Sequence, residues 1–124
     1  MDVQFHNNFE PPVPRDQVKI EQVEIVSYPD RFRVYVHVHV TAFLERPNLL
    51  LVVRDEDDKI AAELNIIETM HNDMEFTLHL RGKADPAGVY SLTTELFYET
   101  RNPPQDRVVE AFIVPSADEM GENA

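Results

Sequence analysis

The most regular pattern in the chain runs from Arg31 to Phe43, where apolar and polar residues alternate. A period of two places the apolar side chains on one face of a β-strand and the polar ones on the other, whereas residues two apart in a helix do not share a face. β-branched valine also suits a half-buried pleated surface. The pattern therefore predicts a central antiparallel strand with one dry and one wet face. The dry face carries Phe32, Val34, Val36, Val38, Val40 and Ala42.

Six further segments have the composition of strands bounded by turn residues: 18–26, 49–53, 59–67, 74–81, 90–98 and 108–114. In 18–26 the apolar residues change parity near Glu21 and Gln22, which predicts a β-bulge or a switch between sheets. Residues 49–53 are apolar throughout, as in a strand covered on both faces. Residues 59–67 are compatible with a short helix, but the short length and the preceding turn favour a hairpin.

The two ends of the chain differ from its middle. Residues 1–17 hold Phe5, Phe9 and Val13 among three prolines, and proline favours extended structure, so an extended arm is expected. Residues 116–124 are small and acidic, which predicts a disordered tail. The 124 residues suit one domain. We therefore expect an arm (1–17), one β-sandwich (18–115) and a tail (116–124).

Seven strands at regular spacing, with turns rich in Pro, Asp and Asn, are typical of an antiparallel sandwich. Within this pattern, the stretch DPAGVYSL at 85–92 resembles the start of strand F in immunoglobulin-like domains. There, an acidic loop and a glycine precede a tyrosine whose hydroxyl bonds back to the loop backbone. The corresponding residues here are Asp85, Gly88 and Tyr90. Leu92 stands where antibody domains carry a cysteine, so the resemblance is to cysteine-free bacterial immunoglobulin-like or fibronectin-III-like sandwiches.

This resemblance implies an all-β fold, a seven-stranded antiparallel immunoglobulin-like sandwich. It also implies that the Tyr90 ring lies in the core and that its hydroxyl bonds to backbone between Lys83 and Pro86. It implies no activity, because the fold carries many unrelated functions.

Charge and composition narrow the classes of partner. The chain has 23 acidic and 11 basic residues, a net charge of −12, which disfavours nucleic acid and anionic membrane surfaces. It has no cysteine, which excludes disulfides, thiolate metal sites and a thiol nucleophile. No apolar run reaches the roughly 18 residues that cross a membrane. The first residues lack the pattern of a signal peptide, so a cytoplasmic location is expected.

The histidines form a candidate metal site. His37 and His39 are two apart on the wet face of the central strand. If this strand pairs with 74–81, as the second and fifth strands of immunoglobulin-like sandwiches do, His79 and Glu75 come to the same face. Two histidines at i and i+2, with a third from a neighbouring strand, is a spacing that metal sites use. The alternatives are an ordinary polar face and a surface whose charge changes near neutral pH.

A second candidate is the acidic turn that contains Asp55, Asp57 and Asp58, because carboxylate oxygens at this density suit calcium. The turn has no glycine and no distal glutamate pattern, so a solvated turn is the alternative. The sequence has no G-x-S-x-G motif and only three glycines, too few for a glycine-rich phosphate loop. No enzymatic activity and no cofactor are expected.

The function expected from these observations is that of a non-enzymatic protein-interaction or assembly module. Exposed strand edges are natural docking sites for other chains. Phe5, Phe9 and Val13 are the expected contacts of the arm, on its own sandwich or on a second copy, and a homodimer through the arm or a sheet edge is favoured. The alternative is a domain that binds a metal or a carbohydrate through a cation, at the histidine face or the acidic turn.

Overall fold

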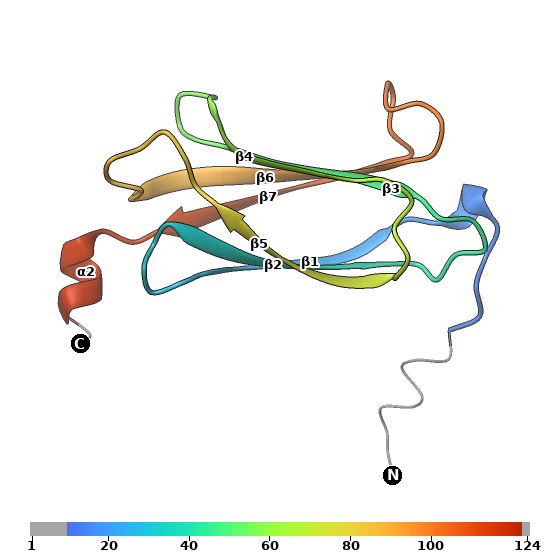
Figure 1. The fold of residues 1–124 in the computed structure, drawn as a ribbon, viewed down its shortest axis with the longest axis horizontal. Helices are drawn as coiled ribbons and strands as arrows, with labels where there is room; N and C mark the ends of the chain where they lie inside the picture. The colour runs from blue at the N-terminus through green and yellow to red at the C-terminus, as the bar shows by residue number, and fades with distance from the viewer. Residues whose placement is uncertain (1–9, 123–124) are drawn as a thin grey trace, which may run out of the picture.

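The computed structural model describes residues 10–122, which form two antiparallel β-sheets packed face to face (Figure 1). The strand order is β1-β2-β5 in one sheet and β4-β3-β6-β7 in the other. The predicted all-β architecture of seven strands is therefore confirmed. The strands are β1 (Ile20–Ser27), β2 (Arg33–Val40), β3 (Asn48–Arg54), β4 (Ile60–Ile66), β5 (Asp73–His79), β6 (Gly88–Phe97) and β7 (Asp106–Val114), with a 3-10 turn η1 (Arg15–Gln17) before β1 and a helix α2 (Ala117–Glu122) after β7.

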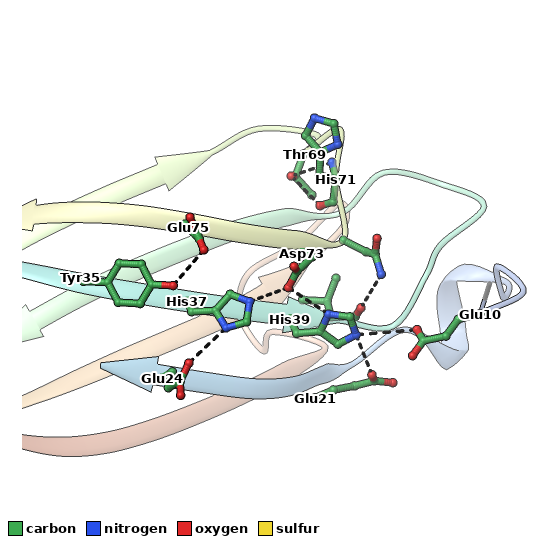
Figure 2. A network of polar contacts seen from close by, with 12 residues as sticks. Glu10, Glu21, Glu24, Tyr35, His37, His39, Thr69, His71, Asp73 and Glu75 are labelled. Carbon is green, nitrogen blue, oxygen red and sulfur yellow. Dashed lines mark hydrogen bonds and ion pairs between the residues drawn. The ribbon is translucent and has the colours of Figure 1, made fainter. Parts of the chain in front are cut away.

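β2 is the middle strand of the three-stranded sheet, and its two faces are sorted as its alternation predicts. Four valines of β2 are completely buried between the sheets, whereas its histidines lie on the outer face (Figure 2). The buried valines are Val34, Val36, Val38 and Val40. They pack in one core with inward side chains of the other sheet, so the period of two in the sequence fixes which side of β2 faces solvent.

The change of parity in β1 is a β-bulge, as predicted. Ile20 pairs with Val40 and Gln22 pairs with His39, so Glu21 is the extra residue of β1. A bulge re-aims the side chain at the irregular position, and here it places Glu21 beside His39.

β3 is covered on both faces, also as predicted, because all five residues from Leu49 to Val53 are buried. The side chains of Leu50 and Val52 point away from the core and lie beneath a small hollow that arginines border. Two of these arginines, Arg101 and Arg107, form ion pairs with Glu95 of β6. Long side chains of this kind can cover apolar surface with their stems while the charge stays in water.

Tyr90 forms the expected corner at the start of β6. Its side chain is 2% exposed and its ring stacks on Phe112, with 5.4 Å between the ring centroids. Its hydroxyl donates to the carbonyl of Pro86 at 2.6 Å, within the stretch that the resemblance indicates. Gly88, which starts β6, has a φ of +146°, a conformation that side chains with a Cβ rarely adopt.

The chain after β7 is helical where a disordered tail was predicted, and this prediction is wrong for residues 117–122. A capping box explains the helix, because the Glu119 amide donates to Ser116 Oγ at 3.2 Å and the Ser116 amide donates to Glu119 Oε1 at 2.7 Å. The S-x-x-E signature was present in the sequence, but composition alone pointed to disorder. Within residues 10–122, no helix has the length and apolar character needed to cross a membrane.

The described part of the arm lies against its own sandwich. Val13 forms a parallel bridge with Phe43, in which the Val13 amide donates to Ala42 O at 2.9 Å and the Leu44 amide donates to Val13 O at 3.0 Å. Val13 therefore contacts its own chain. Phe5 and Phe9 lie outside the described residues.

Candidate functional site

The outer face of the three-stranded sheet carries a network of titratable side chains (Figure 2). His37 and His39 stand next to each other on β2, and acidic residues approach them from both sides. β5 supplies Asp73, because the antiparallel register sets it directly opposite His39.

Asp73 joins the two imidazoles. Its Oδ1 lies 2.6 Å from His37 Nε2 and 3.2 Å from His39 Nδ1, and a carboxylate can only accept, so both ring nitrogens donate. The hydrogen bond to Asp73 raises the pKa of His37, against the opposing effect of partial burial. Partial burial opposes the shift of Asp73 as well, but hydrogen bonds from both histidines hold the pKa of Asp73 below its usual value. His37 also has Glu24 Oε1 at 3.4 Å from its Nδ1.

The second nitrogen of His39 faces two glutamates. Its Nε2 lies 3.3 Å from Glu21 Oε1 and 3.7 Å from Glu10 Oε1. These three residues come from the arm, the bulge of β1 and the end of β2, and one potential ligand atom of each lies within 4.8 Å of the other two. A hollow of about 430 Å³ lies next to the group and is lined by Glu10, Gln22, His37, His39, Ala42, Asn72 and Asp73.

The structure does not bring all four predicted ligands together. The pairing of β2 with β5 is as expected, but its register sets His79 opposite Arg33, six residues along β2 from His39. At about 3.3 Å per residue this is roughly 20 Å away. Glu75 lies opposite His37, but its carboxylate accepts a hydrogen bond from the Tyr35 hydroxyl at 3.0 Å. The register therefore separates His79 from the other two histidines, whereas Glu75 lies beside His37, as predicted, with its carboxylate bound to Tyr35.

Three acidic partners of His39 are absent from the site predicted from the sequence. Asp73 lies one residue before the strand predicted over 74–81, so the predicted strand does not include its pairing with His39. For Glu21 the sequence did contain a signal, because the change of parity in 18–26 predicted an irregularity of the strand near this residue. No sequence pattern pointed to Glu10, because its contact with His39 joins residues 29 apart and depends on how the arm folds back.

The acidic turn is held by its own hydrogen bonds. Asp55 accepts from the amides of Asp57 and Lys59, both at 2.9 Å, and forms an ion pair with Lys83 at 3.3 Å. The hydrogen bond from the Lys59 amide is the main cause that lowers the pKa of Asp55, and Lys83 adds to it. Among the described residues, Asp55, Asp57 and Asp58 do not form a group of three converging ligand atoms. Asp55 is thus already bound by partners within the turn and by Lys83.

A second concave feature is a groove of about 480 Å³ between β4 and β5, at one side of the sandwich. Its lining includes five consecutive residues of β4, Ile60–Leu64, and Thr77, Leu78, His79 and Arg81 of the β5 side. Consecutive residues of a strand point to opposite faces, so a groove lined by all five runs along the backbone edge of β4. The Arg81 amide donates to Ala61 O at 2.9 Å and links the two sheets there.

The opposite side of the sandwich is closed by side chains. The Ile20 amide of β1 donates to Asp106 Oδ2 of β7 at 2.8 Å, and Gln105 Nε2 donates to Val18 O at 2.6 Å. Polar side chains thus bridge the sheets on this side, whereas a backbone hydrogen bond links them on the β4–β5 side, beside the groove.

No family model matches this chain, and no curated protein matches it. Solved structures do match. The chain is similar to a glycosyl hydrolase family 2 member from Bacteroides cellulosilyticus, with a TM-score of 0.55, 11% identity, and coverage of 78% of this chain and 15% of that one. A β-glucuronidase from Bifidobacterium dentium, complexed with coumarin-3-O-glucuronide, gives a TM-score of 0.60, 13% identity, and coverage of 80% and 18%.

A β-D-glucuronidase from Dictyoglomus thermophilum gives a TM-score of 0.51, 18% identity, and coverage of 79% and 16%. The likeness shows a shared fold. This chain spans less than a fifth of the length of each of these three proteins.

Proposed function

We propose that this chain is a non-enzymatic assembly module, an immunoglobulin-like sandwich that forms a homodimer when the N-terminal arm of one copy docks on the open strand edge of another. The strand order and the Tyr90 corner support the immunoglobulin-like assignment. The fold likeness to segments of glycosidases transfers no catalytic residue, because folds of this kind carry many functions.

The observation that carries the proposal is the groove along β4. An exposed strand edge offers a row of unpaired backbone donors and acceptors, which an extended segment satisfies by adding as a further strand. The groove also offers apolar side chains to such a segment: Ile60 is 51% exposed, and the partly buried Leu64 lines the same hollow.

The arm has the length and the pattern for this role. Nine residues precede Glu10, and an extended segment of this length reaches about 30 Å, whereas five residues of β4 span roughly 17 Å. Val3, Phe5 and Phe9 have the same parity, so an added strand would direct them to one face. Each phenylalanine gains about 1.5–3 kcal/mol when its side chain is fully buried.

The position of Glu10 favours a second copy as the acceptor. Glu10 lies beside His39 on the outer face of the three-stranded sheet, close to the end of β2. The groove begins at Ile60, directly after the β3–β4 turn, which is at the other end of the sandwich (Figure 1). An exchange between two copies would be symmetric and would cover both open edges.

Light scattering at tens of micromolar tests the proposal. We expect a dimer for the full chain, and a monomer both for a variant without residues 2–9 and for Ile60→Lys, which places a charge in the groove. Ile113→Lys is the matched control, because Ile113 is 68% exposed on β7, at another edge of the same sheet, and this variant should remain a dimer. A full chain that runs as a monomer, or an Ile60→Lys variant that stays dimeric, contradicts the proposal.

A further inference from the structure

We propose that Glu10, Glu21 and His39 bind one Zn²⁺ ion, and that this ion fastens the base of the N-terminal arm to the three-stranded sheet. The inference is independent of the dimer, because all three residues lie in the described part of one chain. It differs from the site that the sequence predicted, of which it keeps only His39.

The two distances from His39 fit a tetrahedral ion, and the glutamate oxygens lie within 4.8 Å of each other. Zinc bonds of about 2.0–2.1 Å to nitrogen and oxygen set neighbouring ligand atoms roughly 3.4 Å apart. His39 Nε2 lies 3.3 Å from Glu21 Oε1 and 3.7 Å from Glu10 Oε1, on either side of that value. The side chain of Glu10 is 45% exposed, so it can rotate to complete the geometry without moving a strand.

Neighbouring groups already orient two of the three ligands. Asp73 Oδ1 accepts from His39 Nδ1, which leaves the lone pair of Nε2 directed at the glutamates in the neutral ring. The Thr41 hydroxyl lies 3.0 Å from Glu21 Oε2 and can donate to it, so the other oxygen, Oε1, faces His39. Metal sites commonly have such outer partners, in particular a carboxylate that accepts from the second nitrogen of a ligating histidine.

The donor set indicates the class of metal. One imidazole nitrogen and two carboxylate oxygens suit Zn²⁺, whereas Ca²⁺ takes six to eight oxygen ligands and Mg²⁺ prefers an octahedral oxygen shell. Three protein ligands leave a fourth position for water, and the adjacent hollow of about 430 Å³ gives solvent access to it.

Without a metal, the same cluster would be an ion pair of His39 with three carboxylates. The two interpretations differ in what Glu10 does. In the ion pair, Glu10 is the most distant of the partners of His39, at 3.7 Å, so removal of its charge should change the stability of the chain little. In the zinc site, Glu10 is one of three ligands, so its removal weakens binding strongly.

Isothermal titration of the full chain with Zn²⁺ alone tests the assignment, with Mg²⁺ and Ca²⁺ titrated separately for comparison. We expect one Zn²⁺ per chain and no comparable binding of the other two ions. Glu10→Gln, Glu21→Gln and His39→Gln should each weaken zinc binding at least about tenfold. Glu75→Gln and His79→Gln are the matched controls, because they change the same residue types on the same sheet outside the cluster, and they should bind like the parent chain.

A second readout concerns the arm. Zinc should raise the melting temperature of the parent chain and leave that of Glu10→Gln unchanged, and this variant should fold normally because Glu10 lies outside the strands. Failure to bind zinc at one per chain overturns the proposal. So does a Glu10→Gln variant with unchanged affinity, and so does an equal loss in the control variants, which would mean non-specific binding to surface side chains.

Discussion

Replacement of Tyr90 by phenylalanine isolates the hydrogen bond at the corner of β6. The substitution keeps the ring, which is 2% exposed and stacked on Phe112, and removes the hydroxyl that donates to Pro86 O at 2.6 Å. Burial raises the pKa of Tyr90, so the hydroxyl remains a donor through the neutral range. The predicted effect therefore arises from one lost donor and one carbonyl left without its partner.

The magnitude follows from the environment of that carbonyl. A buried acceptor that loses its partner costs about 1–3 kcal/mol, and because the packing of the ring is kept we expect about 1–2 kcal/mol less stability for Tyr90→Phe. For a chain of this size the melting temperature should fall by roughly 3–10 °C. Tyr98→Phe is the matched control, since the Tyr98 hydroxyl donates to Glu45 O at 3.0 Å at an exposed position, where water can replace it.

Urea unfolding followed by circular dichroism measures both variants. Tyr90→Phe should lower the midpoint without a change of slope, and Tyr98→Phe should cost less than about 0.5 kcal/mol. Equal losses in the two variants, or a larger loss for Tyr98→Phe, would refute the argument that the buried hydrogen bond makes the difference.

Two further predictions concern the core and the acidic turn. Val36→Asp should unfold the domain, because Val36 is completely buried and an unpaired charge there costs several kcal/mol. His37→Gln, on the outer face, should cost less than about 1 kcal/mol of stability. Thermal melts that rank the two variants the other way would contradict the assignment of faces. Hydrogen bonding from the Lys59 amide, with the ion pair to Lys83, lowers the folded pKa of Asp55, so its stabilisation is present above the unfolded value of about 3.9 and is lost as pH falls through the folded pKa. Asp55→Asn should therefore melt below the parent chain at pH 7, with a difference that shrinks as pH falls below about 3.9, and a difference that does not shrink there would count against this origin.

Features that depend on residues close in sequence could be predicted from the sequence. The faces of β2, the bulge of β1 and the double coverage of β3 all follow from the spacing of apolar residues, because successive side chains of a strand point to opposite sides. The capping box at Ser116 and Glu119 is equally local, but the small, acidic composition of residues 116–124 predicts disorder, whereas the S-x-x-E spacing indicates a helix start.

Only the tertiary structure decided which polar residues meet. The resemblance to immunoglobulin-like sandwiches implied that β2 and β5 pair, but the register determines that Asp73, and not His79, lies beside His39. In an antiparallel pair, a shift of register changes the partner of every residue in the strand. Because the polar outer face has no buried side chains, its sequence does not indicate which register forms. Glu10 reaches His39 because hydrogen bonds of Val13 hold the arm against the chain after β2, a contact between distant segments that no local pattern encodes.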